Sequence, residues 1–106
     1  MVDINLLETM LASGQDNALL RFTLGSAFIK HNKYEQAVEH LAKSVELDPD
    51  YSAAWKAYGR ALAESGQAEA AITAYEKGII VAEGKGDIQA AKEMHVFLKR
   101  VQKSIT

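Results

Sequence analysis

Cysteine is absent from the 106-residue chain. Its absence excludes disulfide bonds, thiolate metal sites and cysteine nucleophiles together, and it fits a reducing compartment. The chain also lacks a run of about 18 apolar residues, the length that a membrane-spanning helix needs. Residues 1–5 contain no basic residue of the kind that begins a secretory leader. We therefore expect a cytoplasmic protein that does not engage a membrane.

Neither sign of charge is in large excess, since 12 basic and 14 acidic residues leave a net charge of −2. Nucleic-acid binding depends on a clustered excess of lysine and arginine that neutralises phosphates, so nucleic acid is not an expected partner. An apolar content of 48% and a charged content of 25% are ordinary for a globular chain. The length suits one domain, residues 1–106, with a modest core.

Proline occurs once, at Pro49, and it lies between two segments that repeat each other. Residues 18–51 align with residues 52–85 at a spacing of 34. Apolar residues of the two segments also match at helical spacing, which predicts a repeated pair of helices. The aligned identities are Gly25 with Gly59, Ala27 with Ala61, Glu35 with Glu69, Ala37 with Ala71, and Lys43 with Lys77.

Capping residues and turns divide the chain into about six expected helices with no strand. The first begins at Asp3 and ends at residues 13–15, and the second begins at Asp16 or Asn17. The others are expected at about 34–47, 51–64, 68–82 and 87–103. The fifth helix has Glu83 where the third has Pro49, so it can continue past residue 82.

Small residues mark the places where paired helices come closest. Gly25 and Gly59 in the first helices face Ala37 and Ala71 in the second helices, and a larger side chain would separate the backbones. The last helix is expected to bury one side. That side consists of Ile88, Ala91, Met94, Leu98 and Val101.

The residue pattern resembles the tetratricopeptide repeat. The second segment carries Trp55-x-x-Tyr58-Gly59-x-x-Leu62 and Ala71-x-x-x-Tyr75, and the first carries Leu24-Gly25-x-x-Phe28, Ala37-x-x-x-Leu41 and Pro49, with Arg21 in place of the tryptophan. The resemblance implies an all-α, right-handed α-α superhelix. It divides the chain into an N-terminal capping helix (1–15), repeat 1 (18–51), repeat 2 (52–85) and a C-terminal capping helix (87–104).

The two capping segments resemble incomplete repeats. Residues 1–15 keep the repeat spacing and look like the second half of a missing repeat. Residues 87–104 occupy the place of a third first helix, but Glu93 stands where the repeats have Gly25 and Gly59. A close second helix could not pack there, so the resemblance implies a solvating cap.

Residues for catalysis or metal binding do not form a recognisable pattern. His31, His40 and His95 are scattered, with no pair at the i, i+4 spacing of metal ligands. The segment 84–86 has Gly-Lys-Gly but lacks the preceding strand and longer glycine spacing of a phosphate loop. The carboxylates lie on polar faces or in turns. We expect no catalytic residue, no metal, no cofactor and no enzymatic activity.

The resemblance implies that the first helix of each repeat lines a concave groove that binds a peptide or a helix of a partner protein. The residues expected to line it are Leu19, Phe22, Ser26, Ile29, Lys56, Arg60, Ala63, Met94 and Phe97. This mixture suits an apolar segment with an acidic residue. The opposing interpretation is that the large apolar members simply pack against one another.

The sequence also bears on which kind of interaction the protein makes. The subclass that clamps the acidic tails of heat-shock chaperones needs lysine and asparagine where this chain has Phe22 and Ser26, so the sequence does not favour that activity. A protein-interaction adaptor is the favoured function, as a monomer or a weak homodimer. The alternative is a structural module that associates with itself through an exposed apolar surface.

Overall fold

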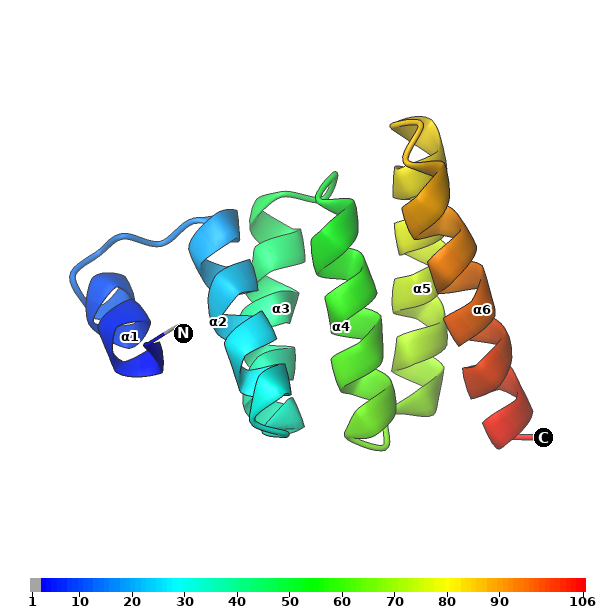
Figure 1. The fold of residues 1–106 in the computed structure, drawn as a ribbon, viewed down its shortest axis with the longest axis horizontal. Helices are drawn as coiled ribbons and strands as arrows, with labels where there is room; N and C mark the ends of the chain where they lie inside the picture. Colours follow the sequence, from blue (N-terminus) through cyan, green and yellow to red (C-terminus); the bar gives the residue numbers. More distant parts are fainter. Residues whose placement is uncertain (1–2) are drawn as a thin grey trace.

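The computed structural model describes residues 3–106, so the first two residues of the expected N-terminal cap lie outside the described part. Six helices and no strand occur in residues 3–106, which confirms the all-α expectation. Consecutive helices run antiparallel and form a row from α1 to α6 (Figure 1). They are α1 (Ile4–Ala12), α2 (Ala18–Lys30), α3 (Tyr34–Leu47), α4 (Ser52–Glu64), α5 (Ala68–Gly84) and α6 (Ile88–Ser104).

Helix starts follow the capping residues. Asp3 and Asp87 accept hydrogen bonds from backbone amides of the first turns of α1 and α6, as expected. Asn17 caps α2 by accepting from the amide of Leu20 at 2.8 Å, which decides between the two candidate caps. Asp16 instead binds Arg21. Because no proline stops α5, that helix continues past residue 82 to Gly84.

The turn inside each repeat needs a left-handed residue at the same place. Asn32 has φ 58° and Gly66, 34 positions later, has φ 84°. Glycine adopts this conformation freely and asparagine tolerates it, which explains how two different residues serve one turn.

The two repeats pack through the expected close contacts. A Cβ atom on Gly59 would lie 2.5 Å from Cε1 of Tyr75, and one on Gly25 would overlap the side chain of Leu41. Ala37 and Ala71 are fully buried beside these contacts. The glycines therefore set the distance between the helices of each pair.

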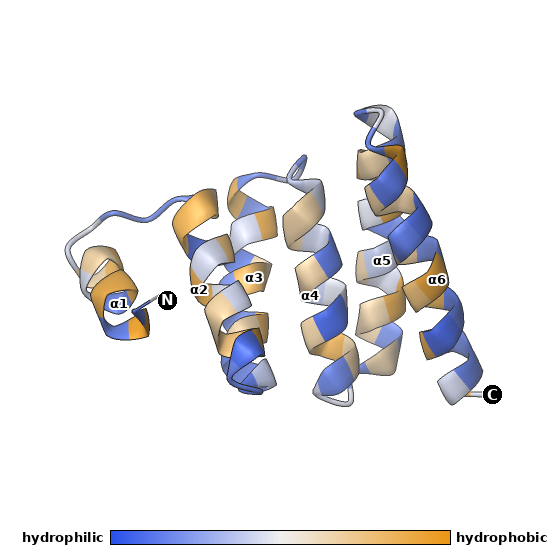
Figure 2. Ribbon diagram, in the orientation of Figure 1, coloured by the Kyte–Doolittle hydropathy of each residue, from blue (hydrophilic) through white to orange (hydrophobic). Residues whose placement is uncertain are grey.

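Figure 2 shows hydrophilic and hydrophobic residues interspersed along the helices. In residues 3–106 no helix combines the length and apolar character needed to cross a membrane.

Polar contacts fasten the joint between the repeats. The indole Nε1 of Trp55 donates to the carbonyl oxygen of Pro49 at 2.7 Å. Lys85, at the end of repeat 2, donates to the carbonyl of Asp50 at 2.9 Å. The hydroxyl of Ser52, at the start of repeat 2, donates to the carboxylate of Asp87 at 3.2 Å. The starts of α4 and α6 are thus tied together at one edge of the stack.

Helix α6 does not keep the repeat spacing. The capping positions of α2 and α4, Asn17 and Tyr51, are 34 residues apart, whereas Tyr51 and Asp87 are 36 apart. The longer α5 accounts for the extra residues. Met94 of α6 packs on Gly78 of α5 with no exposed surface, as expected for a residue on the buried side of the last helix. The expectation that Ile88 is buried was wrong, since 54% of it is exposed.

Candidate protein-binding groove

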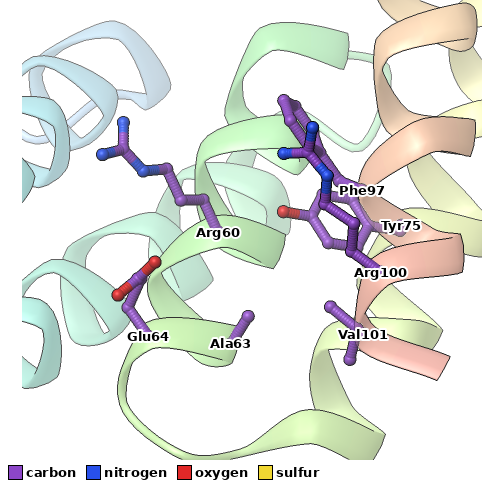
Figure 3. Close-up of a pocket in the computed structure, with 7 residues that line it drawn as sticks. All are labelled: Arg60, Ala63, Glu64, Tyr75, Phe97, Arg100 and Val101. Carbon is purple, nitrogen blue, oxygen red and sulfur yellow. The ribbon is translucent and has the colours of Figure 1, made fainter. Parts of the chain in front are cut away.

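Two neighbouring clefts cross the face formed by the first helices of the repeats and by α6. The central cleft, about 340 Å³, lies between α2, α4 and α6 and is lined by Ser26, Ile29, Lys30, Lys56, Ala57, Arg60, Glu93 and Phe97. The terminal cleft, about 400 Å³, lies between α4, α5 and α6 (Figure 3) and is lined by Arg60, Ala63, Glu64, Tyr75, Phe97, Arg100 and Val101. Because both clefts include Arg60 and Phe97, we treat them as one groove.

Six of the nine residues expected from the sequence line this groove. They are Ser26, Ile29, Lys56, Arg60, Ala63 and Phe97. Five of them lie on α2 and α4, two helices that obey the spacing of 34, and Phe97 lies on α6. Ile29 is nevertheless only 7% exposed, so it contributes to the floor of the central cleft and not to its rim.

The other three expected residues line neither cleft. Leu19 is 63% exposed near the start of α2. Phe22 packs against the Tyr51 ring, with 5.0 Å between ring centroids. Met94 is fully buried against Gly78 of α5. For Phe22 and Met94 the structure therefore agrees with the opposing interpretation, in which apolar residues pack within the protein.

Lys56 is already paired in the central cleft. Its Nζ atom lies 3.1 Å from Oε1 of Glu93, and the two side chains are 36% and 40% exposed. Such a half-exposed ion pair stabilises the protein only slightly, but it neutralises most of the charge that Lys56 would offer a ligand. The glutamate that replaces the repeat glycine thus has a role in the groove.

Two residues of the terminal cleft, Tyr75 and Arg100, were not expected from the sequence to line the groove. Tyr75 packs on Phe97 with 6.0 Å between ring centroids, and the guanidinium of Arg100 lies 5.7 Å from the centroid of Phe97. Burial raises the pKa of Tyr75 to about 12, so its hydroxyl stays protonated at neutral pH.

Metal chemistry has no support in this region. Among residues 3–106 no three histidine or acidic side chains gather in a way that could hold a metal ion.

Comparison with known proteins identifies the class. The tetratricopeptide repeat family model matches residues 22–92, about two thirds of the chain. A TPR repeat-containing protein of Pseudomonas aeruginosa is 48% identical over 100 residues, which cover 94% of this chain and 95% of that protein. The chain therefore belongs to the tetratricopeptide repeat family, as its sequence pattern indicated.

Two further proteins are similar, one by structure and one by sequence. The solution structure of a protein from Bordetella parapertussis is 41% identical, with a TM-score of 0.82, and the match covers 98% of this chain and 90% of that one. A heat-shock-cognate co-chaperone of Aspergillus fumigatus is 33% identical over 89 residues, but the match spans only 26% of that longer protein and 84% of this one. The fold and its relatives support a protein-interaction module, a role that in this family is generally non-catalytic.

Proposed function

We propose that the protein is a non-catalytic adaptor whose groove holds a peptide or a helix of a partner protein. The observation that carries this proposal is the continuity of the two clefts across α2, α4 and α6. A groove that touches three helices can contact several residues of one bound segment, which single-residue pockets cannot do.

The chemistry of the groove suits a segment that is apolar and acidic. Ile29 and Phe97 supply apolar surface to the central cleft, and Arg60 supplies positive charge where the two clefts meet. Ordering a flexible segment opposes binding, so we expect a dissociation constant in the micromolar range, equivalent to about −8 kcal/mol.

The tails of heat-shock chaperones are not the partners that we favour. The co-chaperone relative makes them an obvious candidate, but the positions that would carry the clamping lysine and asparagine are Phe22 and Ser26 here. Phe22 is committed to its contact with Tyr51. A different acidic segment fits these residues better.

The test fills the groove and asks whether binding is lost. Peptides of about a dozen residues are selected from a random display library on the unmodified protein. Ser26→Trp places a large side chain in the central cleft at a position where repeat 2 already carries Arg60, so the fold should tolerate it. Thr73→Trp is the matched control, because Thr73 is exposed on α5 and lines neither cleft.

We expect Ser26→Trp to weaken binding of the selected peptides at least about tenfold, a change of about 1.4 kcal/mol, and Thr73→Trp to leave it unchanged. Equal binding to both variants, or failure to select any peptide, would reject the groove as the site. Sedimentation of the unmodified protein at several concentrations then checks the alternative of self-association. A tight dimer that Ser26→Trp dissociates would favour that alternative.

A further inference from the structure

The terminal cleft holds two arginines from different helices. Arg60 comes from α4 and Arg100 from α6, and both are exposed. The three ion pairs found within residues 3–106 join Arg21 to Asp16, Lys43 to Glu46 and Lys56 to Glu93, so neither groove arginine takes part in one. Both guanidinium groups therefore keep their charge and their donors available to a ligand.

Arg100 is held in place by aromatic packing. Its guanidinium lies over Phe97, and Phe97 in turn packs against Tyr75, which rests on Gly59. A cation that stacks on an aromatic ring loses less freedom when it binds a ligand, since part of its rotamer freedom is already restricted. The direction of Arg100 is thus set by the core of repeat 2.

The hydroxyl of Tyr75 adds a third donor. Only 2% of Tyr75 is exposed, and Figure 3 shows its oxygen pointing into the cleft between the two arginines. No hydrogen bond of this hydroxyl is found within residues 3–106, and no buried side-chain polar atom there lacks a partner. The oxygen consequently reaches the surface of the cleft, where it can donate to a bound group.

The geometry points to the terminal cleft as a binding site for the carboxylate of an aspartate or glutamate side chain in the partner segment, held by Arg60, Arg100 and the hydroxyl of Tyr75. This inference rests on the proposed peptide groove and names its anionic contact. Guanidinium groups and a hydroxyl are all donors, and a carboxylate offers two acceptor oxygens. The cleft is open at its rim, so the segment can continue past it and need not end there.

Lys56 is not part of this site, although the sequence paired it with Arg60. Lys56 forms an ion pair with Glu93, whereas Arg100 forms none within residues 3–106 and lines the same cleft as Arg60. Glu64 also lines the cleft and opposes an anion. Its removal by Glu64→Gln should therefore raise the affinity for an acidic segment about twofold to threefold.

A double-mutant cycle tests the contact. The selected peptides are synthesised with amidated C-termini, each also with its acidic residue changed to the corresponding amide, and their affinities are measured by fluorescence anisotropy. We expect Arg100→Gln to weaken the acidic peptide about tenfold and the amide peptide hardly at all. Lys99→Gln is the matched control, because it removes the same charge from the neighbouring residue outside both clefts. Tyr75→Phe should cost the acidic peptide about twofold to fivefold.

Each outcome bears on one proposal. Loss of binding in Ser26→Trp without coupling between Arg100 and the acidic residue would overturn the carboxylate site and leave the groove intact. Peptides that bind only with a free C-terminus would show that a chain end, and not a side chain, is recognised. If Lys99→Gln weakened the acidic peptide as much as Arg100→Gln, general attraction between charges would replace the specific contact.

Discussion

The two ends of the stack are covered in different ways. At the C-terminal end α6 has 17 residues and buries Ala90, Ala91, Met94 and Val101. At the N-terminal end α1 has nine residues, none of which is buried. Its apolar residues only partly cover the core of repeat 1, and within residues 3–106 no side-chain hydrogen bond joins it to another helix.

At one pair of equivalent positions the two repeats carry residues of opposite character. Repeat 2 has Trp55 and Gly78, which pack tightly beneath α6. Repeat 1 has Arg21 in the place of Trp55, and Arg21 binds Asp16 at 2.8 Å and His40 at 3.2 Å. Repeat 1 thus has a polar cluster at the position where repeat 2 has an apolar contact with the long C-terminal cap. The repeats therefore share a period but are adapted to different neighbours.

Removing the anchor of the C-terminal cap should produce the largest loss of stability. Met94 is fully buried between α5 and α6, so Met94→Ala should reduce the free energy of unfolding by about 3 kcal/mol. Val96→Ala, on the same helix at 50% exposure, should change it by less than about 0.5 kcal/mol. Urea unfolding followed by circular dichroism measures both. Equal small losses would mean that α6 does not belong to the cooperative core.

Overpacking the contact inside each repeat should cost somewhat less. Gly59→Leu forces a side chain into the Tyr75 ring and Gly25→Leu into Leu41, so each should destabilise the protein by about 2 kcal/mol or more. Gly84→Ala is the control, because a Cβ there meets nothing within 4 Å and alanine favours the helix by up to about 1 kcal/mol. Unchanged melting temperatures in both leucine variants would contradict the observed packing.

Most of the fold could be predicted because it depends on local signals. Capping residues, the single proline and the repeated glycines specify helix starts, a joint and close contacts, all of which act within a few residues or one period. Contacts between separate helices could not be predicted in this way. Which side chain fits against Gly78, for example, is decided only when α5 and α6 pack.

The residues that line the two clefts could be predicted only in part. Ser26 and Arg60 were placed in the groove because α2 and α4 are 34 residues apart. Phe97 of α6 was expected in the groove and lines both clefts, whereas Met94 was expected both there and on the buried side of α6 and lies only on the buried side. Arg100 was not expected to line the groove. The pairing of Lys56 with Glu93 is a contact between separate helices, which a spacing argument does not reveal.

Weakening the N-terminal cap should have a smaller effect than either change above. Leu7 is only partly buried against repeat 1, so Leu7→Ala should lower stability by about 1 kcal/mol or less. Hydrogen exchange offers a second measurement, since the amides of α1 should exchange faster than those in the middle of α6. If Leu7→Ala cost as much as Met94→Ala, the two ends would be equally integrated and the comparison would fail.

The smallest expected effect concerns pH and the polar cluster of repeat 1. His40 stacks on Phe28, with 5.5 Å between ring centroids, and its Nδ1 lies 3.2 Å from Nη1 of Arg21. Since a guanidinium can only donate, Nδ1 must accept, which requires the neutral imidazole with its proton on Nε2. Desolvation first, and the charge of Arg21 second, lower the pKa of His40 below its ordinary value of 6.5, although Glu39, Glu8 and Asp16 oppose the shift.

Because the folded-state pKa of His40 is the lower one, the unfolded chain binds a proton at a higher pH than the folded protein does. The contribution of neutral His40 to stability is therefore complete above about pH 6.5 and is lost as the pH falls through the folded-state pKa. His40→Gln should remove the pH dependence of stability that comes from His40. The difference in unfolding free energy between the unmodified protein and the variant should then change between the folded-state pKa of His40 and about pH 6.5, and should be constant above pH 6.5. Urea unfolding at several pH values measures the difference, and NMR titration of the His40 ring gives the pKa directly. A ring that titrates at or above 6.5, with a constant difference throughout, would show that Arg21 and burial do not hold His40 neutral.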